Sequence, residues 1–351
     1  MKFIKSASLT LNQFFNMEIL ITGGAGFLGF HLAKLLASEK KNHIVLVDNF
    51  FRGKKDSDLK KLLKNRRNVE LKKIDLTNAR ELKKLDKGYD YVYHLAAING
   101  TQNFYEIPHI VLRNNVLSAI NLLDWFIVHK TKKSKIFLAS SSETYAGSFK
   151  VIKDFPIPTP ENVPLTIEDV TNPRWSYGGS KMIKELLFLN YAKIYGIRMS
   201  IVRYHNVYGP RMGYGHVVPE FFERLYRKED PFSIFGGKET RAFCYVEDMV
   251  WASQEVMEID KTDGEIVNIG NDQEEITIKE LAQRVFNVTG FHPYFNIKPA
   301  PQGSVARRCP DLTKIKKLTS YRPRISLDEG LKKTWEWYKN DLAHNAKTTH
   351  S

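Results

Sequence analysis

The chain has 351 residues, of which 42% are hydrophobic and 26% are charged, an ordinary composition for a globular protein with one large domain or two modest ones. Its two cysteines, Cys244 and Cys309, exclude a disulfide framework and show no metal-ligand spacing, and no apolar run approaches the ~20 residues that a membrane-spanning helix needs. The low cysteine content fits the reducing cytosol, and these observations predict neither a metal site nor a membrane partner. The net charge of +14 comes from lysines spread over polar helix faces without interleaved aromatic residues, so we expect no nucleic-acid partner.

Residues 1–16 stand apart from the rest of the chain. They lack the sustained apolar core and the small-residue cleavage site of a signal peptide, and Met17-Glu18 directly precede the first predicted strand. We therefore expect either that translation begins at Met17 or that this leader is a loose extension.

The first predicted elements, in residues 19–36, are a strand, a tight turn and a helix. An apolar run ends in a turn with Gly23, Gly26 and Gly29, and the helical pattern that follows begins with Phe27 and Leu28. In a dinucleotide-binding unit the first glycine allows the turn, the second lets the backbone approach the pyrophosphate, and the third lets helix pack on strand. The free N–H groups of the helix N-terminus favour the phosphates. This region therefore predicts a dinucleotide site.

Three further strands end in residues that suit the same ligand. The run 43–47 ends in Asp48, about 20 residues beyond the glycines, where an acid meets the ribose hydroxyls of NAD and repels the extra phosphate of NADP. Arg52, close behind, weakens that preference slightly. The run 69–74 ends in Asp75-Leu76, placed to meet the adenine, and the run 91–97 ends in Leu95-Ala96-Ala97, small enough for the nicotinamide half. Strand ends in register, with helices between them, predict an α/β fold with a doubly wound parallel sheet that binds NAD.

The remaining elements complete this domain and add a smaller lobe. We expect helices near 112–123 and 176–195, strands at 135–139 and 198–203, a proline-rich loop at 155–173, and then an irregular region with a strand at 267–270 and helices at 278–288 and 327–338. The predicted organisation is a Rossmann-type NAD-binding domain over 17–205 with return segments near 240–270, a C-terminal substrate-binding lobe mainly over 206–340, and a flexible polar tail over 342–351.

A catalytic group is expected where the fifth strand and the long helix meet. Tyr177 and Lys181 are four residues apart on the predicted helix and so share a face. A phenol with pKa ~10 is a weak base at neutral pH, and a nearby ammonium brings it into working range. A serine of the cluster Ser140-Ser141-Ser142, which follows the fifth strand, would hydrogen-bond the oxygen being oxidised.

These residues resemble those of the extended short-chain dehydrogenase/reductases that remodel nucleotide sugars. The resemblance runs from Met17 to about Tyr338, and it rests on the motifs TGGAGFLG (22–29), HLAA (94–97), SSETY (141–145), YGGSK (177–181), RYHNVYGP (203–210) and TRAF (240–243).

The resemblance implies a role for each group. NAD stays bound and takes a hydride from the sugar at C4, Tyr177 is the base, Lys181 tunes it and Ser142 orients the hydroxyl. Asn206 touches the diphosphate, which Arg241 and either Arg307 or Arg308 clamp. The residues expected to contact NAD are Gly23, Gly26, Phe27, Leu28, Gly29, Asp48, Asp75, Leu76, Leu95, Ala96, Ala97, Asn115, Tyr177 and Lys181. The family often dimerises through a four-helix interface, to which the helices at 112–123 and 176–195 would contribute.

Glu143 leaves the exact reaction open. Serine-glutamate at 142–143 and TRAF resemble UDP-glucuronate decarboxylases, and serine-glutamate also resembles GDP-mannose dehydratases; simple UDP-galactose 4-epimerases commonly have alanine there. The region 97–101 and 203–206 is nearer to GDP-mannose 3,5-epimerase, whose cysteine position is held here by Glu143. A glutamate beside a 4-keto sugar could move a C5 proton or help protonate a carbanion. We expect an NDP-sugar epimerase or dehydratase, with a UDP-glucuronate decarboxylase or a net NDP-sugar dehydrogenase as alternatives.

Overall fold

A computed structural model describes residues 17–85, 88–300 and 305–348 of the chain, without the side chains of 345–348. The expected leader at 1–16 lies outside these residues. Within them, no helix is both long and apolar enough to cross a membrane, and no three potential metal-ligating side chains cluster together. Cys244 and Cys309 are buried free thiols.

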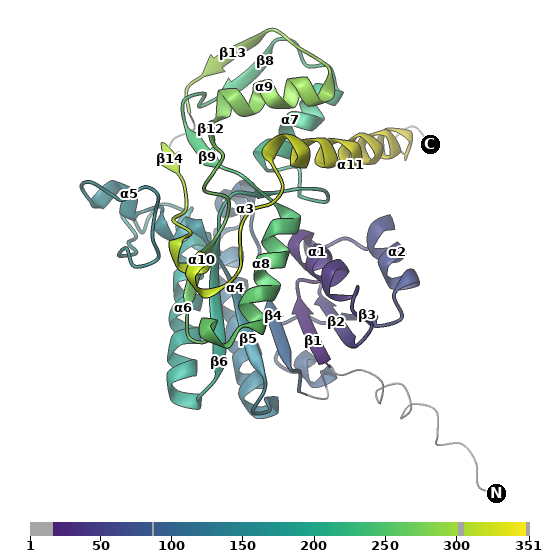
Figure 1. Ribbon diagram of the computed structural model, residues 1–351, viewed down its shortest axis with the longest axis vertical. Helices are drawn as coiled ribbons and strands as arrows, with labels where there is room; N and C mark the ends of the chain where they lie inside the picture. The colour runs from purple at the N-terminus through teal and green to yellow at the C-terminus, as the bar shows by residue number, and fades with distance from the viewer. Residues whose placement is uncertain (1–16, 86–87, 301–304, 349–351) are drawn as a thin grey trace, which may run out of the picture.

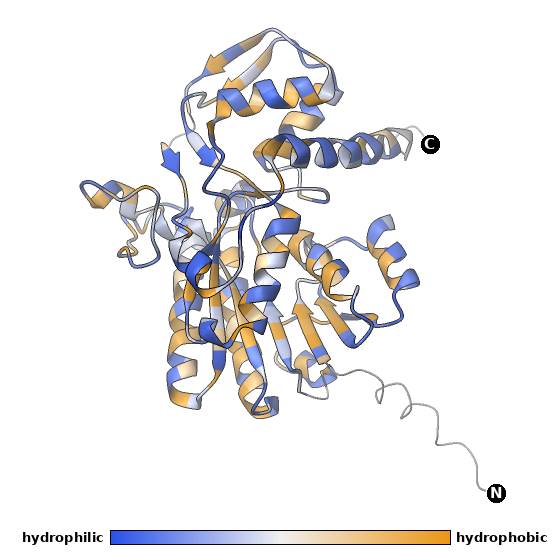
Figure 2. Ribbon diagram, in the orientation of Figure 1, coloured by the Kyte–Doolittle hydropathy of each residue, from blue (hydrophilic) through white to orange (hydrophobic). Residues whose placement is uncertain are grey.

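A seven-stranded parallel sheet forms the centre of the larger domain (Figure 1). Its order is β11-β6-β5-β4-β1-β2-β3, with β1 (Met17–Thr22), β2 (Asn42–Asp48), β3 (Val69–Lys73), β4 (Tyr91–His94), β5 (Lys135–Ser141), β6 (Arg198–Tyr204) and β11 (Ile266–Ile269). Except for the edge strand β3, the strands are largely apolar because helices cover both faces of such a sheet; Figure 2 shows them mostly in the hydrophobic colour. The expected doubly wound α/β fold is confirmed.

Alternate residues of each strand enter two separate cores, one on each face. Ile19 and Ile21 belong to one buried cluster, whereas Leu20 belongs to the other. Among the helices of this domain, α4 packs against α6 and α1 packs against α8. The helices are α1 (Phe27–Leu36), α2 (Ser57–Asn65), α3 (Thr101–Glu106), α4 (Pro108–His129), α5 (Ser148–Val151), α6 (Trp175–Tyr195) and α8 (Val246–Glu258).

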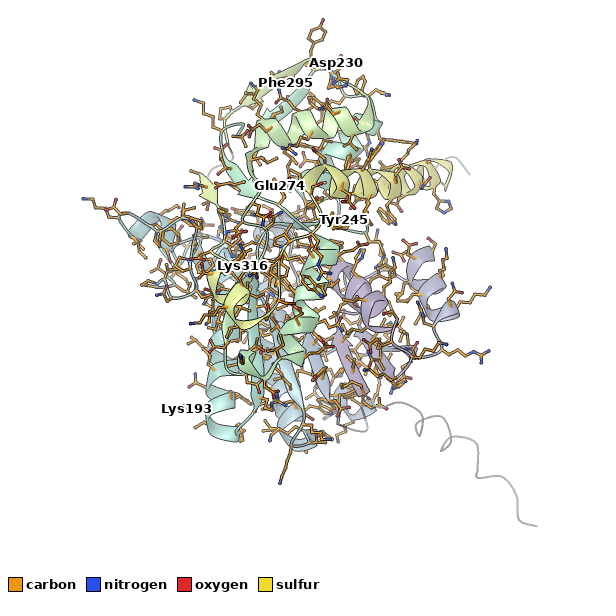
Figure 3. All side chains as sticks on the ribbon, in the orientation of Figure 1. Lys193, Asp230, Tyr245, Glu274, Phe295 and Lys316 are labelled. Atoms are coloured by element: carbon orange, nitrogen blue, oxygen red, sulfur yellow. The ribbon has the colours of Figure 1, made fainter. Side chains whose placement is uncertain are left out.

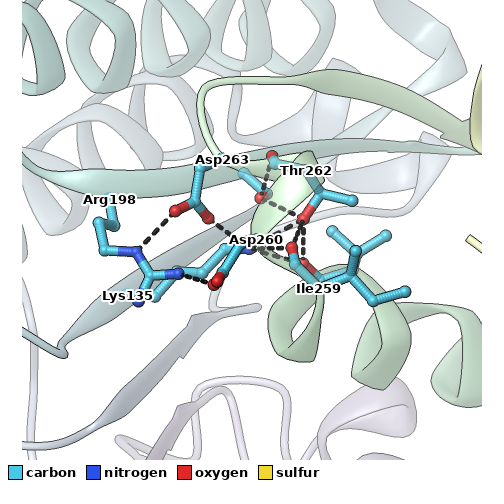
Figure 4. Close-up of polar contacts among 8 residues, drawn as sticks. Lys135, Arg198, Ile259, Asp260, Thr262 and Asp263 are labelled. Carbon is cyan, nitrogen blue, oxygen red and sulfur yellow. Dashed lines mark hydrogen bonds and ion pairs between the residues drawn. The ribbon is translucent and has the colours of Figure 1, made fainter. Parts of the chain in front are cut away.

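The return of the chain to the sheet is fixed at its amino-terminal edge by Lys135 of β5 (Figure 4). Its buried ammonium donates to the carbonyl oxygens of Val256 (2.8 Å) and Ile259 (3.2 Å) and to the Thr262 hydroxyl (2.9 Å), and it forms an ion pair with Asp263 at 2.7 Å. One side chain therefore joins β5 to the end of α8 and the turn before β11.

The smaller lobe lies beyond the carboxyl ends of the strands (Figure 1). Among the described residues it contains a three-stranded sheet, two two-stranded ladders and three helices: β7 (Val207–Tyr208), β8 (Phe232–Phe235), β9 (Thr240–Ala242), β10 (Cys244–Tyr245), β12 (Glu275–Thr277), β13 (Phe295–Lys298), β14 (Arg307–Arg308), α7 (Val217–Tyr226), α9 (Ile278–Thr289) and α11 (Leu327–Thr348). The short helix α10 (Thr313–Leu318) returns to the larger domain and packs against β11 (Figure 1). In Figure 3, Tyr245 and Glu274 mark the junction of the two lobes, with Asp230 and Phe295 at the outer end of the small one.

The tail that we expect from residue 342 begins inside α11, which continues to Thr348. Its flexibility stays a prediction. The polar composition of this stretch hides its anchors. Tyr338 and Leu342 are buried, and Asp341 accepts a hydrogen bond from the Tyr214 hydroxyl at 2.7 Å. Tertiary contacts with the small lobe thus hold a segment whose sequence has no long apolar stripe.

Candidate active site

The glycine turn between β1 and α1 is packed too closely for any side chain at two of its positions. A Cβ on Gly23, whose φ is +72°, would lie 2.9 Å from the Ala96 nitrogen, and one on Gly29 would lie 2.2 Å from the Gly23 oxygen. Gly26 precedes α1 in extended conformation and donates to the Gly23 oxygen at 3.0 Å. This bare backbone at a helix N-terminus is the cradle that a pyrophosphate requires.

Asp48 forms the next wall of the cradle at the end of β2. Its carboxylate accepts the N–H of Ala25 (3.1 Å) and of Phe50 (2.8 Å). Burial raises the pKa of this carboxyl, and the two N–H groups oppose the rise. Arg52, which the sequence places close to Asp48, donates instead to the Asn99 carbonyl oxygen.

A cavity of about 720 Å³ runs along these strand ends. Twelve of the fourteen residues expected to contact NAD line it: Gly23, Gly26, Phe27, Leu28, Gly29, Asp48, Asp75, Leu76, Leu95, Ala96, Ala97 and Asn115. The other two, Tyr177 and Lys181, do not line it. The cradle, the helix N-terminus and the ribose-binding acid together fit a dinucleotide.

Tyr177 and Lys181 both lie on α6, buried beside the end of β5. Lys181 donates to the Ala139 carbonyl oxygen at 2.6 Å, and its ammonium is 5.4 Å from the centre of the Tyr177 ring. Burial raises the pKa of Tyr177 to about 12, opposed by a hydrogen bond with Ser141 and by the charge of Arg52. Burial also lowers the pKa of Lys181 to about 8. The hydroxyl that meets the phenol is thus that of Ser141, which the sequence analysis did not single out.

Ser142 and Glu143 start a short 3-10 helix directly after β5. The Ser141 hydroxyl accepts the Glu143 N–H at 3.2 Å, and Ser142 is buried. This turn carries Ser142 past the strand end, so Ser141 is the serine placed at the phenol. The role assigned to Ser142 stays a prediction.

Glu143 lies between two arginines from distant parts of the chain. Arg174 donates to Oε2 at 2.6 and 3.2 Å, and Arg308 of β14 donates to Oε1 at 2.5 Å. Burial would raise the pKa of Glu143, but the charges and hydrogen bonds of Arg308 and Arg174 overcome it and hold the pKa at about 2. No local signal in the sequence pairs Arg174 with this carboxylate.

The expected diphosphate residues separate into two groups. Arg308 pairs with Arg241 in the ladder of β14 and β9 and lies at Glu143, whereas Arg307 points away, half exposed, into an ion pair with Glu275 at 2.7 Å. Burial and the charge of Arg308 lower the pKa of Arg241 to about 10. Of the two arginines left open by the sequence, Arg308 is therefore the one at the site.

Asn206 also lies at this junction. It has a positive φ of 35°, and its amide donates to the Ala242 carbonyl oxygen at 3.3 Å. The residue therefore sits where β6 gives way to the small lobe, within reach of the segment that carries Arg241.

A buried polar network supports the site from below. Arg203 of β6 binds Glu185 of α6 with two hydrogen bonds of 3.0 and 2.7 Å, and Glu185 accepts the Ser140 hydroxyl at 2.5 Å. Arg203 also donates to the Tyr145 hydroxyl at 2.8 Å. The network locks β5, β6 and α6 together where Ser141, Tyr177 and Lys181 project, so it positions these groups without touching the cavity.

A parallel sheet with a dinucleotide cradle and a tyrosine–lysine pair on the following helix defines an NAD-dependent enzyme of the short-chain dehydrogenase/reductase class. The comparison with protein families is specific: the family described as "NAD dependent epimerase/dehydratase family" matches residues 19–270. The chain belongs to that family. The expected NAD cofactor and enzyme class, a nucleotide-sugar epimerase/dehydratase, are confirmed at this level.

Relatives and solved structures agree with the family. A UDP-N-acetyl-alpha-D-glucosaminuronate decarboxylase of Bacillus cytotoxicus is 35% identical over 330 residues, 91% of this chain and 97% of the relative. The UDP-glucose 4-epimerase of Thermotoga maritima, solved with UDP-glucose, has a TM-score of 0.80 and 32% identity over 93% of this chain and 100% of its own. The UDP-glucuronic acid 4-epimerase of Bacillus cereus, solved with UDP-glucuronic acid and NAD, has a TM-score of 0.79 and 27% identity over 92% and 99%.

Proposed function

We propose that the protein decarboxylates a UDP-hexuronic acid through a 4-keto intermediate. The observation that carries this proposal is the Glu143 carboxylate held ionised between Arg174 and Arg308, next to Ser141 and Tyr177. Decarboxylase is the activity in the name of the Bacillus cytotoxicus relative, which matches over nearly the whole chain.

The residues present can take up the proton of the C4 hydroxyl and stabilise the negative charge that this reaction develops. NAD in the cradle would accept a hydride from C4 of the sugar and return it at the end. Tyr177, with Lys181 beside it, takes the proton of the C4 hydroxyl. The resulting C4 ketone lies β to the C6 carboxylate, so the C5–C6 bond breaks, carbon dioxide leaves and the electron pair moves toward the C4 oxygen. C5 then takes up one proton from water, which restores the C4 ketone before the hydride returns. The hydroxyls of Ser141 and Tyr177 donate to that oxygen as its charge develops.

The ionisation of Glu143 argues against proton abstraction at C5. A dehydratase must remove that proton with a base, and a base is effective when its pKa lies near the working pH. A carboxylate with a pKa of about 2, saturated by two guanidinium groups, is too weak a base. Loss of carbon dioxide leaves the electron pair at C5 without any base, so this arrangement suits decarboxylation.

The charge around Glu143 suits an anionic nucleotide sugar. Arg174, Arg241 and Arg308 meet Glu143 there, with Glu239 as a second carboxylate that acts on Arg241. Among the described residues Arg241 has no ion pair, and its guanidinium donates to the Thr240 carbonyl oxygen at 2.7 Å. We propose that Arg241 and Arg308, with Asn206, receive the diphosphate of the nucleotide sugar.

The second candidate is 4-epimerisation of the same substrate, which keeps the carboxylate. It is favoured by the structural match to the Bacillus cereus enzyme with UDP-glucuronic acid and NAD. In that case the 4-keto sugar would rotate within the site, so that the hydride returns to the opposite face of C4. Glu143 would then serve only to hold Arg174 and Arg308.

The experiment is product analysis by mass spectrometry and proton NMR, with purified protein and UDP-glucuronic acid, UDP-N-acetylglucosaminuronic acid, UDP-glucose and UDP-galactose, without added cofactor. We expect release of carbon dioxide and a UDP-pentose from one of the two acids. An isobaric product with changed coupling constants would establish the epimerase instead. Turnover that requires added NAD and accumulates NADH would establish a net dehydrogenase.

We also propose that the enzyme is a homodimer built through α4 and α6. These two helices pack against each other and expose apolar side chains to solvent, among them Leu112, Val128, Ile183, Leu186 and Ile194. Sedimentation should give twice the chain mass, and Leu186→Glu should shift it toward the monomer; a monomeric wild-type protein contradicts the proposal.

A further inference from the structure

The cavity that holds the glycine turn has a second wall from the end of the small lobe. Trp337, Asp341 and His344 of α11 line the same cavity as Gly26 and Asp48. No sequence motif links these residues to the glycine turn: the sequence predicts Trp337 in a helix of the substrate-binding lobe and His344 in the polar tail. The helix therefore reaches across from the substrate lobe to the cofactor groove.

Trp337 joins α11 directly to the Rossmann domain. Its indole N–H donates to the carboxylate of Asp58, in the first turn of α2, at 2.7 Å. Lys60 of α2 and Asp48 of β2 line the cavity nearby, which places this contact at the adenosine-ribose end. A hydrogen bond to a charged group is among the stronger single contacts available to a side chain.

A second contact crosses the glycine turn itself. Arg211, in the segment 209–216 that leads into α7, forms an ion pair with Asp56 at 2.7 Å and has φ +67°. Its guanidinium donates to the Ala25 oxygen at 3.3 Å and lies 4.1 Å from the ring centre of Phe30. The side chain thereby covers the outer surface of the turn that cradles the phosphates.

The segment and the helix are also tied to each other. The Tyr214 hydroxyl donates to Asp341 of α11 at 2.7 Å, and the Tyr338 hydroxyl donates to the Met212 carbonyl oxygen. Met212, Gly213, Tyr214 and His216 line the cavity together with Trp337. The two pieces of the small lobe therefore act as one unit against the cofactor groove.

We propose that α11 and the segment 209–216 form a cofactor clasp, in which Trp337 on Asp58 and Arg211 on Asp56 close the adenosine end of the groove and retain NAD between the two lobes. Release of NAD then requires these contacts to open, so the cofactor stays bound while nucleotide sugars enter and leave at the other end. The clasp acts on NAD alone, and it holds whichever sugar reaction the enzyme performs.

The test compares Trp337→Phe with the matched control Trp335→Phe. Trp335 lies on the same helix and stacks on Phe222 at 5.3 Å inside the small lobe, away from the cavity lining. Protein loaded with unlabelled NAD is mixed with isotope-labelled NAD. At successive times the protein is separated by gel filtration, and mass spectrometry measures how much labelled NAD it has taken up. We expect Trp337→Phe to exchange NAD about 10-fold faster than wild type, the loss expected for one hydrogen bond to a charged group, and Trp335→Phe to exchange at the wild-type rate.

A second pair of variants separates the contact from a general loss of structure. Asp58→Asn keeps an acceptor for the indole and should retain slow exchange, whereas Asp58→Leu should exchange as fast as Trp337→Phe. Wild-type exchange rates in both Trp337→Phe and Asp58→Leu would overturn the clasp. Equal acceleration by Trp335→Phe would overturn it too, because it would trace NAD retention to the packing of the lobe rather than to its contact with α2.

Discussion

Replacing Glu143 by glutamine removes one negative charge from between Arg174 and Arg308 and leaves the side-chain shape unchanged. The pKa of Glu143 is held at about 2, which is about 5 units below neutral pH. For accepting a proton, this difference makes Glu143 less favourable by about 7 kcal/mol than a base with a pKa near 7. Its task is therefore to hold the two guanidinium groups. We expect Glu143→Gln to lower kcat about 10- to 100-fold through misplacement of those groups.

The pH profile of kcat is the decisive measurement, because a positioning carboxylate and a proton-abstracting one differ there. Turnover of the active UDP-sugar is followed between pH 5 and 9 in wild type, in Glu143→Gln and in Glu275→Gln, whose carboxylate forms the neighbouring exposed pair with Arg307. We expect no acid limb assignable to Glu143 in wild type, the same profile shape in Glu143→Gln, and near-wild-type kinetics in Glu275→Gln. An acid limb near pH 6 to 7 that disappears in Glu143→Gln would refute the argument, since it would show Glu143 working as the base.

Three further substitutions test the site and its supports. Tyr177→Phe should lower kcat at least ~100-fold while bound NAD is retained, and unchanged turnover would remove Tyr177 as the base. Lys135→Met should cost about 3 kcal/mol in thermal unfolding, because carbonyl oxygens at the end of α8 lose a charged donor, whereas exposed Lys132→Met should cost nothing measurable. Lys184, fully buried with a 3.4 Å hydrogen bond to the Ala96 oxygen, has its pKa held well below the ordinary value by burial and by Lys181. Between this lowered pKa and the ordinary value of ~10.5, the unfolded chain binds a proton that the folded chain does not, so wild-type stability should rise with pH over that interval. Urea unfolding at several pH values should show a flatter rise in Lys184→Met.

The parts of the candidate site that the sequence could predict lie either next to each other along the chain or at the ends of neighbouring parallel strands. The glycine turn needs no distant partner to be recognised, since Gly23 must adopt a positive φ and Gly29 must lie against the Gly23 carbonyl. Asp48 and Ala96 follow from the rule that parallel strands end at one edge. For the same reason the alternation of Ile19, Leu20 and Ile21 between two cores could be anticipated from the strand period alone.

The parts that it could not predict depend on small turns and on distant pairings. The serine at the phenol is Ser141 because the chain enters a 3-10 turn immediately after β5, and no propensity distinguishes one serine of the run 140–142 from the next. Arg308 and Arg307 are neighbours on a strand, so they point to opposite faces, and only the pairing of β14 with β9 decides which of them meets Glu143. Arg174 lies 31 residues beyond Glu143, and the segment between them, which includes α5, carries no periodic signal that would pair the two.

The proposed roles of Tyr177 and Lys181 depend on the charge of the cofactor that the clasp would retain. Burial raises the pKa of Tyr177 to about 12 and lowers that of Lys181 to about 8, so at pH 7 the phenol is neutral while Lys181 still carries most of its positive charge. At pH 7 the phenolate then lies about 7 kcal/mol above the phenol. An added positive charge within a few ångströms lowers such a pKa by ~1–3 units, and the cation that the groove is built to receive is the nicotinamide ring of oxidised NAD. Tyr177 is therefore a useful base only while the groove is filled. An enzyme that must return the same hydride to its substrate has a direct reason to keep the groove closed at its far end, where Trp337 meets Asp58.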